Sequence, residues 1–360
     1  METYFTYANL YRAYLDCRKR KSNSLYCLQF NERLEENLLD LEKQLQACTY
    51  RPGRSIAFIV QKPKIREIFA ADFRDRVVHH LLYNYLSPIF EKTFIHDSYA
   101  CRRGKGTHRA RLRLQKFMVQ IERERERESG AARQYYLQMD IKSFFTSIDQ
   151  QILYDLIVKK VKNEEILWLA KVIIFHDCAR DIPPKIQSSP SLFAQLPADK
   201  SLFTAPRGKG LPIGNLTSQF FANVYLDQLD QFVKHTLKAH RYIRYVDDFL
   251  IIGEDKTTLT LMRAQIADFV AQKLILTIHP KKQHIRPIAD GIDFVGFIIR
   301  SDYVLLRRRV VGEWRWRLRH CTNQYKYQQI AASYNAQAAW ANSHTLIISR
   351  TARRQISPDQ

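Results

Sequence analysis

The chain has 360 residues, of which 57 are Lys or Arg and 36 are Asp or Glu, so its formal net charge is +21 at pH 7. Hydrophobic residues make up 46% of the sequence and aromatic residues 12%, which is enough apolar surface for a core and excludes an intrinsically disordered chain. The charge predicts a polyanionic partner, with nucleic acid expected first and an anionic membrane surface second. The length predicts two or three domains, or one domain with lobes.

Several other classes of protein are not expected. No run of about 18 apolar residues is present, which argues against a transmembrane helix, and the N-terminus lacks the basic and apolar regions of a signal peptide. The six cysteines form no C-x-x-C pair, so neither a zinc ribbon nor a disulfide framework is expected, and reduced thiols in a cytosol fit best. These residues are Cys17, Cys27, Cys48, Cys101, Cys178 and Cys321.

The N-terminal part of the chain predicts a helical segment followed by two strands. Residues 4–49 are expected to be helical, because apolar residues recur there at three- and four-residue spacing. Pro52-Gly53 breaks this segment. A first strand is expected at residues 55–60, and residues 62–68 predict a basic turn that leads into a second strand.

Longer elements are predicted in the middle of the chain. Residues 72–90 predict a helix that ends near Pro88, and the highly charged residues 110–128 predict a solvated helix with ion pairs at i,i+3 and i,i+4. Residues 135–139 predict an apolar strand. Residues 181–210 are rich in Pro, Ser, Lys and Gly and predict a long loop, which is often functional.

Three carboxylates carry the strongest chemical signal. Asp247 and Asp248 are adjacent and lie between two β-prone runs, which predicts a hairpin with both residues at its turn. Asp is common in turns, so the pair alone also fits a structural role. Asp140 follows a second apolar strand, and acids at two strand ends could together hold two Mg²⁺ ions for phosphoryl transfer. On a basic protein, this combination indicates an enzyme that acts on nucleic acid, either a polymerase or a nuclease.

The acids belong to a series of motifs that resembles, in order and spacing, the motifs of reverse transcriptases. The resemblance covers residues 50–310, most of the chain. The matching segments are Lys64–Arg66 and Arg102–Thr107 (fingers), Asp140–Phe145 (first palm box), Gly210–Gln219 (substrate pocket), Tyr245–Asp248 (Y-x-D-D hairpin), and His279–Lys282 and Phe294–Phe297 (last palm boxes with the primer grip).

This resemblance implies an α+β fold, the right-hand polymerase with fingers, palm and thumb, in which an antiparallel palm sheet carries the catalytic hairpin. The implied domains are an N-terminal helical extension with the fingers at residues 1–134, a palm at 135–300 with a loop insertion at about 181–209, and a thumb at 301–360.

The resemblance also implies a two-metal site that takes Mg²⁺, with Mn²⁺ as a substitute. The residues implied to hold the metals, and to form the catalytic cluster, are Asp140, the carbonyl of Ile141, Asp247 and Asp248. Two other acids, Asp72 and Asp149, are expected at helix starts instead.

Several residues are implied to bind the incoming dNTP. Lys64 and Arg66 alternate along the predicted strand and share one face, where they would contact the triphosphate; general contact with the RNA backbone is the alternative. Phe145 is implied to exclude the 2′-hydroxyl of ribonucleotides, with Phe144 in the core. Lys281 or its neighbour Lys282 is expected at the pyrophosphate leaving group.

The substrate-pocket motif departs from most reverse transcriptases, which carry Gln where Ile213 stands and Pro where Gln219 stands. With Gly214, the string Ile-Gly-Asn-Leu-Thr-Ser-Gln resembles the enzymes of diversity-generating retroelements, which misincorporate at template adenines during mutagenic retrohoming. A pocket with fewer hydrogen-bond partners discriminates poorly, so Ile213 is expected to lower fidelity, with plain packing as the alternative.

The remaining implied contacts are with nucleic acid, and Trp314 and Trp316 are expected either to stack on it or to pack inside the protein. The implied residues are Arg102, Arg103, Lys105, Tyr245, Gly296, Arg307 and Arg308.

The expected partners are template RNA, the RNA/cDNA hybrid, dNTPs and a small basic accessory protein, without a membrane. Two alternatives stay open. One is a retron-, intron- or abortive-infection-type reverse transcriptase without a mutagenic role. The other is a catalytically silent RNA-binding protein on the same fold.

Overall fold

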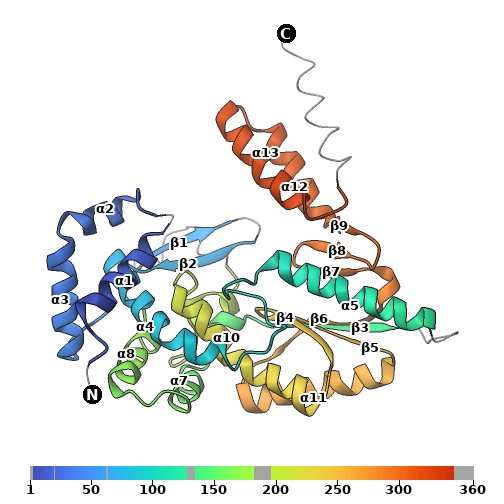
Figure 1. Ribbon diagram of the computed structural model, residues 1–360, viewed down its shortest axis with the longest axis horizontal. Helices are drawn as coiled ribbons and strands as arrows, with labels where there is room; N and C mark the ends of the chain where they lie inside the picture. Colours follow the sequence, from blue (N-terminus) through green and yellow to red (C-terminus); the bar gives the residue numbers. More distant parts are fainter. Residues whose placement is uncertain (1–2, 20, 62–63, 128–133, 182–195, 344–360) are drawn as a thin grey trace, which may run out of the picture. The chain divides into compact units, whose positions relative to one another are not determined.

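The computed structural model describes residues 3–19, 21–61, 64–127, 134–181 and 196–343 (Figure 1). The chain divides into two compact units. The first unit comprises residues 1–95, 140–236 and 265–281, and the second comprises residues 96–139, 237–264 and 282–360. The first unit is mainly helical, and the second contains most of the β-structure. None of the helices among the described residues is both long enough and apolar enough to span a membrane.

The first unit consists of helices, one hairpin and short turns of 3-10 helix. Its elements are α1 (Tyr7–Arg18), α2 (Leu25–Glu32), α3 (Leu34–Gln46), β1 (Ile56–Val60), β2 (Arg66–Ala70), α4 (Phe73–Glu91), α6 (Phe144–Ser147), α7 (Gln150–Val158), α8 (Glu164–Ile174) and α10 (Leu216–Gln231). Asp72 and Asp149 accept hydrogen bonds from backbone N–H groups at the starts of α4 and α7. Their predicted places at helix starts are therefore confirmed.

Helix α4 spans Phe73–Glu91, so the helix predicted over residues 72–90 is confirmed to within one residue at each end. Phe90 lies beyond Pro88 and is buried, with its ring 5.7 Å from the ring of Phe220 in α10. This contact holds the last turn of the helix although proline removes one backbone donor.

Helix α10 lies at the centre of the first unit, and most of its residues are buried. A helix buried on nearly all sides must satisfy its polar side chains within the protein. The imidazole of His79 in α4 lies 2.7 Å from the hydroxyl of Thr217 in α10. Burial lowers the pKa of His79 to about 3, so this ring is neutral at pH 7 and joins the two helices by a hydrogen bond without a buried charge.

Strands β1 and β2 form an antiparallel hairpin in which Val60 pairs with Arg66. Ile56, Phe58 and Val60 project from one face of β1 and are exposed. Lys64 precedes the first residue of β2, so the prediction that Lys64 and Arg66 alternate along one strand was wrong. The reason is the register, because Val60, the last residue of β1, pairs with Arg66, the first residue of β2.

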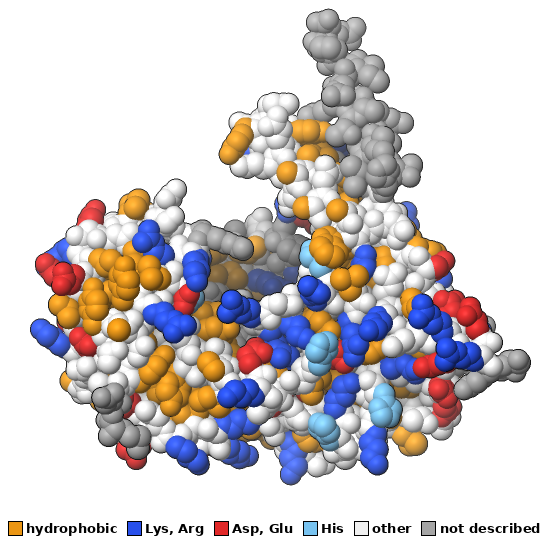
Figure 2. Space-filling view, viewed as in Figure 1, with side chains coloured by type: hydrophobic (Ala, Val, Ile, Leu, Met, Phe, Trp, Pro, Cys, Tyr) orange, Lys and Arg blue, Asp and Glu red, His pale blue; other side chains and the backbone are white. Residues whose placement is uncertain are grey.

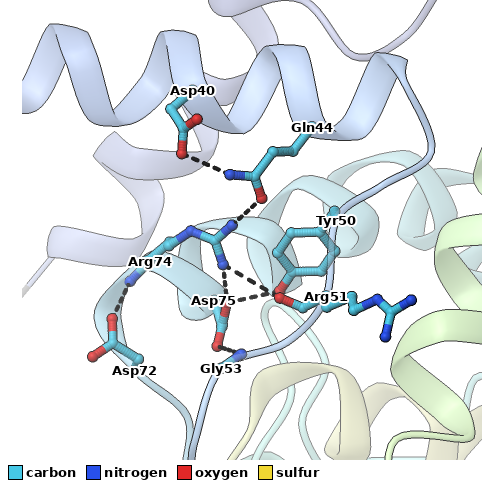
Figure 3. A network of polar contacts seen from close by, with 8 residues as sticks. All are labelled: Asp40, Gln44, Tyr50, Arg51, Gly53, Asp72, Arg74 and Asp75. Carbon is cyan, nitrogen blue, oxygen red and sulfur yellow. Dashed lines mark hydrogen bonds and ion pairs between the residues drawn. The ribbon is translucent and has the colours of Figure 1, made fainter.

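A polar network joins α3 to the start of α4 (Figure 3). The buried carboxylate of Asp75 accepts hydrogen bonds from the hydroxyl of Tyr50 at 2.8 Å, the backbone N–H of Gly53 at 2.7 Å and the guanidinium of Arg74 at 3.0 Å. Arg74 also donates to the side chain of Gln44 in α3. Burial raises the pKa of Asp75 even though these donors oppose the shift. The network therefore fixes a carboxylate that is costly to bury.

The second unit contains sheets with helices packed against them. Its elements are α5 (Thr107–Arg127), β4 (Arg241–Tyr245), β5 (Asp248–Gly253), β7 (Ile292–Phe294), β8 (Phe297–Ile299), β9 (Val304–Leu306), α12 (Arg308–Arg319) and α13 (Gln324–Ala338). Strands β3 (Tyr135–Ile141) and β6 (Ile278–Pro287), and helix α11 (Lys256–Leu274), each have residues in both units. The four-stranded sheet has the order β4-β5-β3-β6, and β7, β8 and β9 form an antiparallel sheet of their own.

One hydrophobic core holds the second unit together. Helix α5 lies along the sheet (Figure 1) and contributes Leu114 and Phe117 to a cluster that includes Ile243 of β4 and Leu250 of β5. Phe294 of β7 completes this contact set. The predicted charged helix is thus confirmed. Its apolar face packs against both the β4–β5 hairpin, which was predicted to be catalytic, and the sheet of β7, β8 and β9.

The Asp75 network predicts a large effect of one substitution on stability. Asp75→Ala should lower the free energy of unfolding by about 3 kcal/mol, because it leaves the buried hydroxyl of Tyr50 unsatisfied and removes the acceptor of the Gly53 N–H and the Arg74 guanidinium. Asp72→Ala, at the helix start three residues earlier, should cost only about 1 kcal/mol. Urea denaturation of both variants checks this, and equal losses would contradict the role of the network.

Candidate active site

The hairpin of β4 and β5 presents two of the three predicted acids. Tyr245 pairs with Asp248 across the antiparallel ladder, and Val246 and Asp247 form the turn between them. Val246 has φ +57°, a left-handed conformation that is unfavourable for a β-branched residue. Both carboxylates are half-buried. The predicted hairpin with these acids at its turn is confirmed.

The side chain of Arg244 holds this turn from inside the protein. Its guanidinium is buried, at 1% exposure, and donates to the carbonyl of Val246 at 3.0 Å and to the hydroxyl of Ser98 at 3.1 Å. The backbone of Arg244 also bonds to that of Asp97 at 2.9 Å and of Tyr99 at 3.0 Å. The strained turn is therefore fixed by contacts with a segment distant in sequence.

A chain of polar contacts orients Asp248. The side-chain amide of Gln138 in β3 donates to Asp248 Oδ1 at 2.9 Å and to the carbonyl of Asp293 in β7 at 3.2 Å. The carboxylate of Asp293 in turn accepts from Arg307 Nε at 2.7 Å. One amide thus connects the catalytic hairpin with the hairpin that carries the predicted primer grip.

The third acid, Asp140, lies near the end of β3, which neighbours β5 in the sheet order. Asp140 is half-buried, and Ile141, the last residue of the strand, is buried. Carboxylate and carbonyl oxygens are the ligands that Mg²⁺ prefers, so the donor types suit this ion. Among the described residues, no group of three or more His, Cys, Asp or Glu side chains is placed so that it could hold a metal ion.

The first unit joins the end of the first palm box to the substrate-pocket motif. Phe144 is buried and Phe145 is half-buried, with their rings 5.4 Å apart. The carbonyl of Phe145 accepts a hydrogen bond from the N–H of Leu211 at 2.8 Å, and the carbonyl of Ile148 accepts one from Gly210 at 2.8 Å. The backbone of the pocket motif is therefore attached to the residue predicted to contact the sugar.

The pocket motif also touches the fingers hairpin. The N–H of Phe69 in β2 donates to the carbonyl of Ile213 at 2.8 Å. Gly214 has φ +136°, and a Cβ there would lie 2.5 Å from the carbonyl oxygen of Phe69. Only glycine permits this approach of two backbones. Ile213 is half-buried, while Gln219 on α10 and Arg66 on β2 are exposed.

The lysines predicted at the pyrophosphate lie on β6. Lys281 is exposed and Lys282 is half-buried. The backbone N–H of Lys281 donates to Nδ1 of His279 at 3.2 Å. These contacts do not favour one lysine over the other.

The basic loop predicted to bind nucleic acid is braced by its own side chains. Arg102 donates to the carbonyl of Ser98 at 3.0 Å, and Lys105 donates to the carbonyl of His96 at 2.8 Å. Arg103 is exposed. Two of the three cations thus brace the loop, while Arg103 is exposed to solvent.

The other predicted contacts with nucleic acid lie around the β7–β8 turn and α12. Gly296 has φ +92° in that turn, and its carbonyl accepts from the N–H of Arg307 at 3.0 Å. Arg308 lines a cavity of about 520 Å³ beside β9. Trp314 is buried and stacks on a tyrosine of α13, whereas Trp316 is 51% exposed. Packing is therefore the observed role of Trp314.

Comparison with known proteins places the chain in a family. Residues 60–299, two thirds of the chain, match the family model described as "Reverse transcriptase (RNA-dependent DNA polymerase)". The chain belongs to the reverse transcriptase family. The predicted enzyme class, an RNA-directed DNA polymerase, and the predicted α+β polymerase fold with a catalytic hairpin are confirmed at the level of this family.

Two curated proteins are similar to the chain. Protein YkfC of Escherichia coli (strain K12) is 23% identical over 343 residues, which cover 84% of this chain and 80% of that protein. The "Uncharacterized 91 kDa protein in cob intron" of Schizosaccharomyces pombe is 24% identical over 197 residues, which cover 54% of this chain and 20% of that protein.

Solved telomerase structures also match the chain. The apo telomerase from Candida tropicalis, truncated from its C-terminal domain, has a TM-score of 0.46 and 12% identity over 71% of this chain and 55% of that chain. The telomerase from Candida albicans with a TWJ fragment of telomeric RNA has a TM-score of 0.45 and 11% identity over 76% of this chain and 51% of that one. The chain spans about half the length of these telomerases.

The sequence analysis missed Arg244, Gln138 and Asp293. Arg244 lies inside an apolar, β-prone run, where an arginine is rarely buried unless its donors are satisfied. That position was an available signal for a buried structural cation. Gln138 contacts Asp248 and Asp293, and each of them is more than 100 residues away from it in the sequence. No local pattern could therefore have identified Gln138 or Asp293.

Gly214 generates a second prediction about stability. Gly214→Ala should lower the free energy of unfolding by about 2 kcal/mol, since the new Cβ would clash with the carbonyl of Phe69 and the backbone conformation is strained for alanine. Gly312→Ala in α12 is the control, because a Cβ there meets nothing within 4 Å, and it should stabilise by up to about 1 kcal/mol. Thermal and urea denaturation would show opposite signs; the same sign in both variants would refute the proposed close approach.

Proposed function

We propose that this chain is an active reverse transcriptase that copies a template RNA into cDNA, with Asp140, Asp247 and Asp248 as its catalytic acids. The observation that carries the proposal is the β4–β5 turn with its two acids, on a strand that neighbours the Asp140-bearing β3 in a chain of this family.

The residues that would hold the metal ions are the three carboxylates and the carbonyl of Ile141, all of them oxygen donors. When bound, two Mg²⁺ ions, or Mn²⁺ in their place, supply charge stabilisation for the attacking and leaving oxygens of the phosphoryl transfer. Gln138 would keep Asp248 oriented toward this task, because its amide donates a hydrogen bond to the carboxylate.

Most of the residues proposed for the dNTP site belong to the first unit. Arg66, exposed at the start of β2, would contact the triphosphate, with Lys64 from the preceding turn. Phe145 would exclude the 2′-hydroxyl of a ribonucleotide, which its half-buried ring and the buried Phe144 support. Lys281 or Lys282 would neutralise the leaving pyrophosphate.

The second unit would bind the template RNA and the RNA/cDNA hybrid. Basic side chains are spread over much of the face drawn in Figure 2, as expected for a chain with a net charge of +21. Phosphate contacts give binding without base specificity and make it dependent on salt. The residues proposed for these contacts are Arg102, Arg103, Lys105, Tyr245, Gly296, Arg307 and Arg308.

The finer proposal is a diversity-generating retroelement enzyme that is error-prone at template adenines and works with a small basic accessory protein. Ile213 and Gln219 in the pocket motif support it. An intron-type enzyme without a mutagenic role is the second candidate, favoured by the similarity to the Schizosaccharomyces pombe protein in the cob intron. The division into fingers at 1–134, palm at 135–300 and thumb at 301–360 belongs to the same proposal.

The catalytic proposal predicts a selective loss in one variant. Asp247→Ala should reduce dNTP incorporation on an RNA template by a factor of about 10³ or more, because several kcal/mol of charge stabilisation are removed. Its affinity for RNA, measured by fluorescence anisotropy, should change little. Asp302→Ala, at an exposed position, is the control. If the wild-type chain binds RNA but incorporates no dNTP, the silent RNA-binding alternative is supported instead.

The mutagenic proposal depends on a single side chain. Ile213→Gln should lower misincorporation opposite template adenine about tenfold, since it restores a hydrogen-bonding group to the pocket. Ile213→Val keeps the apolar character and should retain the wild-type error spectrum. Sequencing of cDNA made on a defined RNA measures all three. Equal error spectra for the wild type and Ile213→Gln would leave packing as the role of Ile213.

A further inference from the structure

A short segment between the long loop and the pocket motif contacts two parts of the proposed dNTP site. This segment, Ala198–Thr204, forms two turns of 3-10 helix, Ala198–Lys200 and Leu202–Thr204. No function was predicted for it from the sequence, which indicated only a loop. Its contacts all lie within the first unit, and they attach it to β2 on one side and to the residues after Asp140 on the other.

Glu67 attaches the segment to β2. Its carboxylate is 5% exposed and accepts hydrogen bonds from the hydroxyl of Ser201 at 2.9 Å and from the N–H of Leu202 at 2.7 Å. The rings of Phe203 and Phe69 lie 5.4 Å apart beside this contact. A buried carboxylate without such donors would be strongly destabilising, so the segment and β2 hold each other in place.

Asp199 attaches the segment to the first palm box. Its carboxylate accepts a hydrogen bond from the hydroxyl of Ser143 at 2.9 Å and lies 3.6 Å from the ammonium of Lys142. The carbonyl of Asp199 accepts from the hydroxyl of Thr146 at 2.8 Å. The segment therefore contacts the side chains of residues on both sides of Phe145.

The backbone just before Phe144 and Phe145 has an unfavourable conformation that needs support from other parts of the protein. Ser143 has φ +48°, which costs a non-glycine residue about 1 kcal/mol or more. This residue begins the single turn of α6, on which Phe145 is mounted. A four-residue helix is not stable by itself, so the direction of the Phe145 ring depends on contacts from outside the helix.

We infer that the Ala198–Thr204 segment positions Phe145, and that Asp199 is a positioning residue that sets the discrimination between deoxyribonucleotides and ribonucleotides. The inference rests on the proposed function, specifically on Phe145 as the group that excludes the 2′-hydroxyl. Exclusion by steric contact is sensitive to displacements of about 1 Å. Loss of the Asp199 contacts lets the ring move away from the sugar without any change in the ring itself.

The test is the ratio of kcat/KM for a dNTP to that for the matching rNTP, measured on one primer and RNA template. Asp199→Ala should lower this ratio about tenfold. Ser143→Ala should lower it similarly, and the double variant should lose no more than the larger single loss, because both changes remove the same contact. Asp155→Ala is the matched control, since this exposed acid accepts a side-chain hydrogen bond from Gln151 on α7, outside the proposed site; its ratio should stay at the wild-type value.

Two further variants separate the possible failures. Asp199→Asn keeps an acceptor for Ser143 and should recover most of the wild-type ratio, which a general loss of folding would not produce. Phe145→Ala tests the gate itself. If Phe145→Ala lowers the ratio and Asp199→Ala does not, the inference is overturned and the gate stands. If Phe145→Ala leaves the ratio unchanged while dNTPs are still incorporated, the role of Phe145 and the inference both fail, and the polymerase activity stands.

Discussion

A hydrogen bond from the buried side chain of Arg244 to the carbonyl of Val246 fixes the turn on which the proposed chemistry depends. Val246 has φ +57°, a conformation whose cost is on the order of 1–3 kcal/mol. Arg244 donates to its carbonyl at 3.0 Å from a buried position. The buried guanidinium needs an acceptor for its N–H donors, and the strained turn is held in place by the same hydrogen bond. The directions of Asp247 and Asp248 are therefore set by the packing of the second unit and not by the turn sequence alone.

A chain of hydrogen bonds links Asp248 to the β7–β8 hairpin. The neutral amide of Gln138 donates to the carboxylate of Asp248 and to the carbonyl of Asp293. The carboxylate of Asp293 accepts from the side chain of Arg307, and the backbone N–H of Arg307 donates to the carbonyl of Gly296 in the β7–β8 turn. The orientation of Asp248 and the position of the proposed primer contact therefore depend on the same set of hydrogen bonds.

Local features were predictable from the sequence, whereas features that depend on distant partners were not. Asp149 was placed correctly at a helix start because a capping side chain acts on residues two or three positions away. The hairpin followed from β-prone runs on both sides of two acids. Helix α4 was placed to within one residue of its observed bounds. The part played by Arg244 was missed because its partner Ser98 is 146 residues away in the sequence. The acids were identified by residue type and order, and their convergence stays a prediction.

The backbone at the position proposed to control fidelity is fixed independently of the side chain that it carries. The carbonyl of Ile213 is bonded to the N–H of Phe69, and neither group belongs to the isoleucine side chain. Gly214 then holds the chain against β2 in a conformation that other residues rarely adopt. Any residue that tolerates the local backbone can therefore occupy position 213. An apolar residue at this position leaves the pocket with one polar anchor fewer, while the polymerase framework around it stays the same.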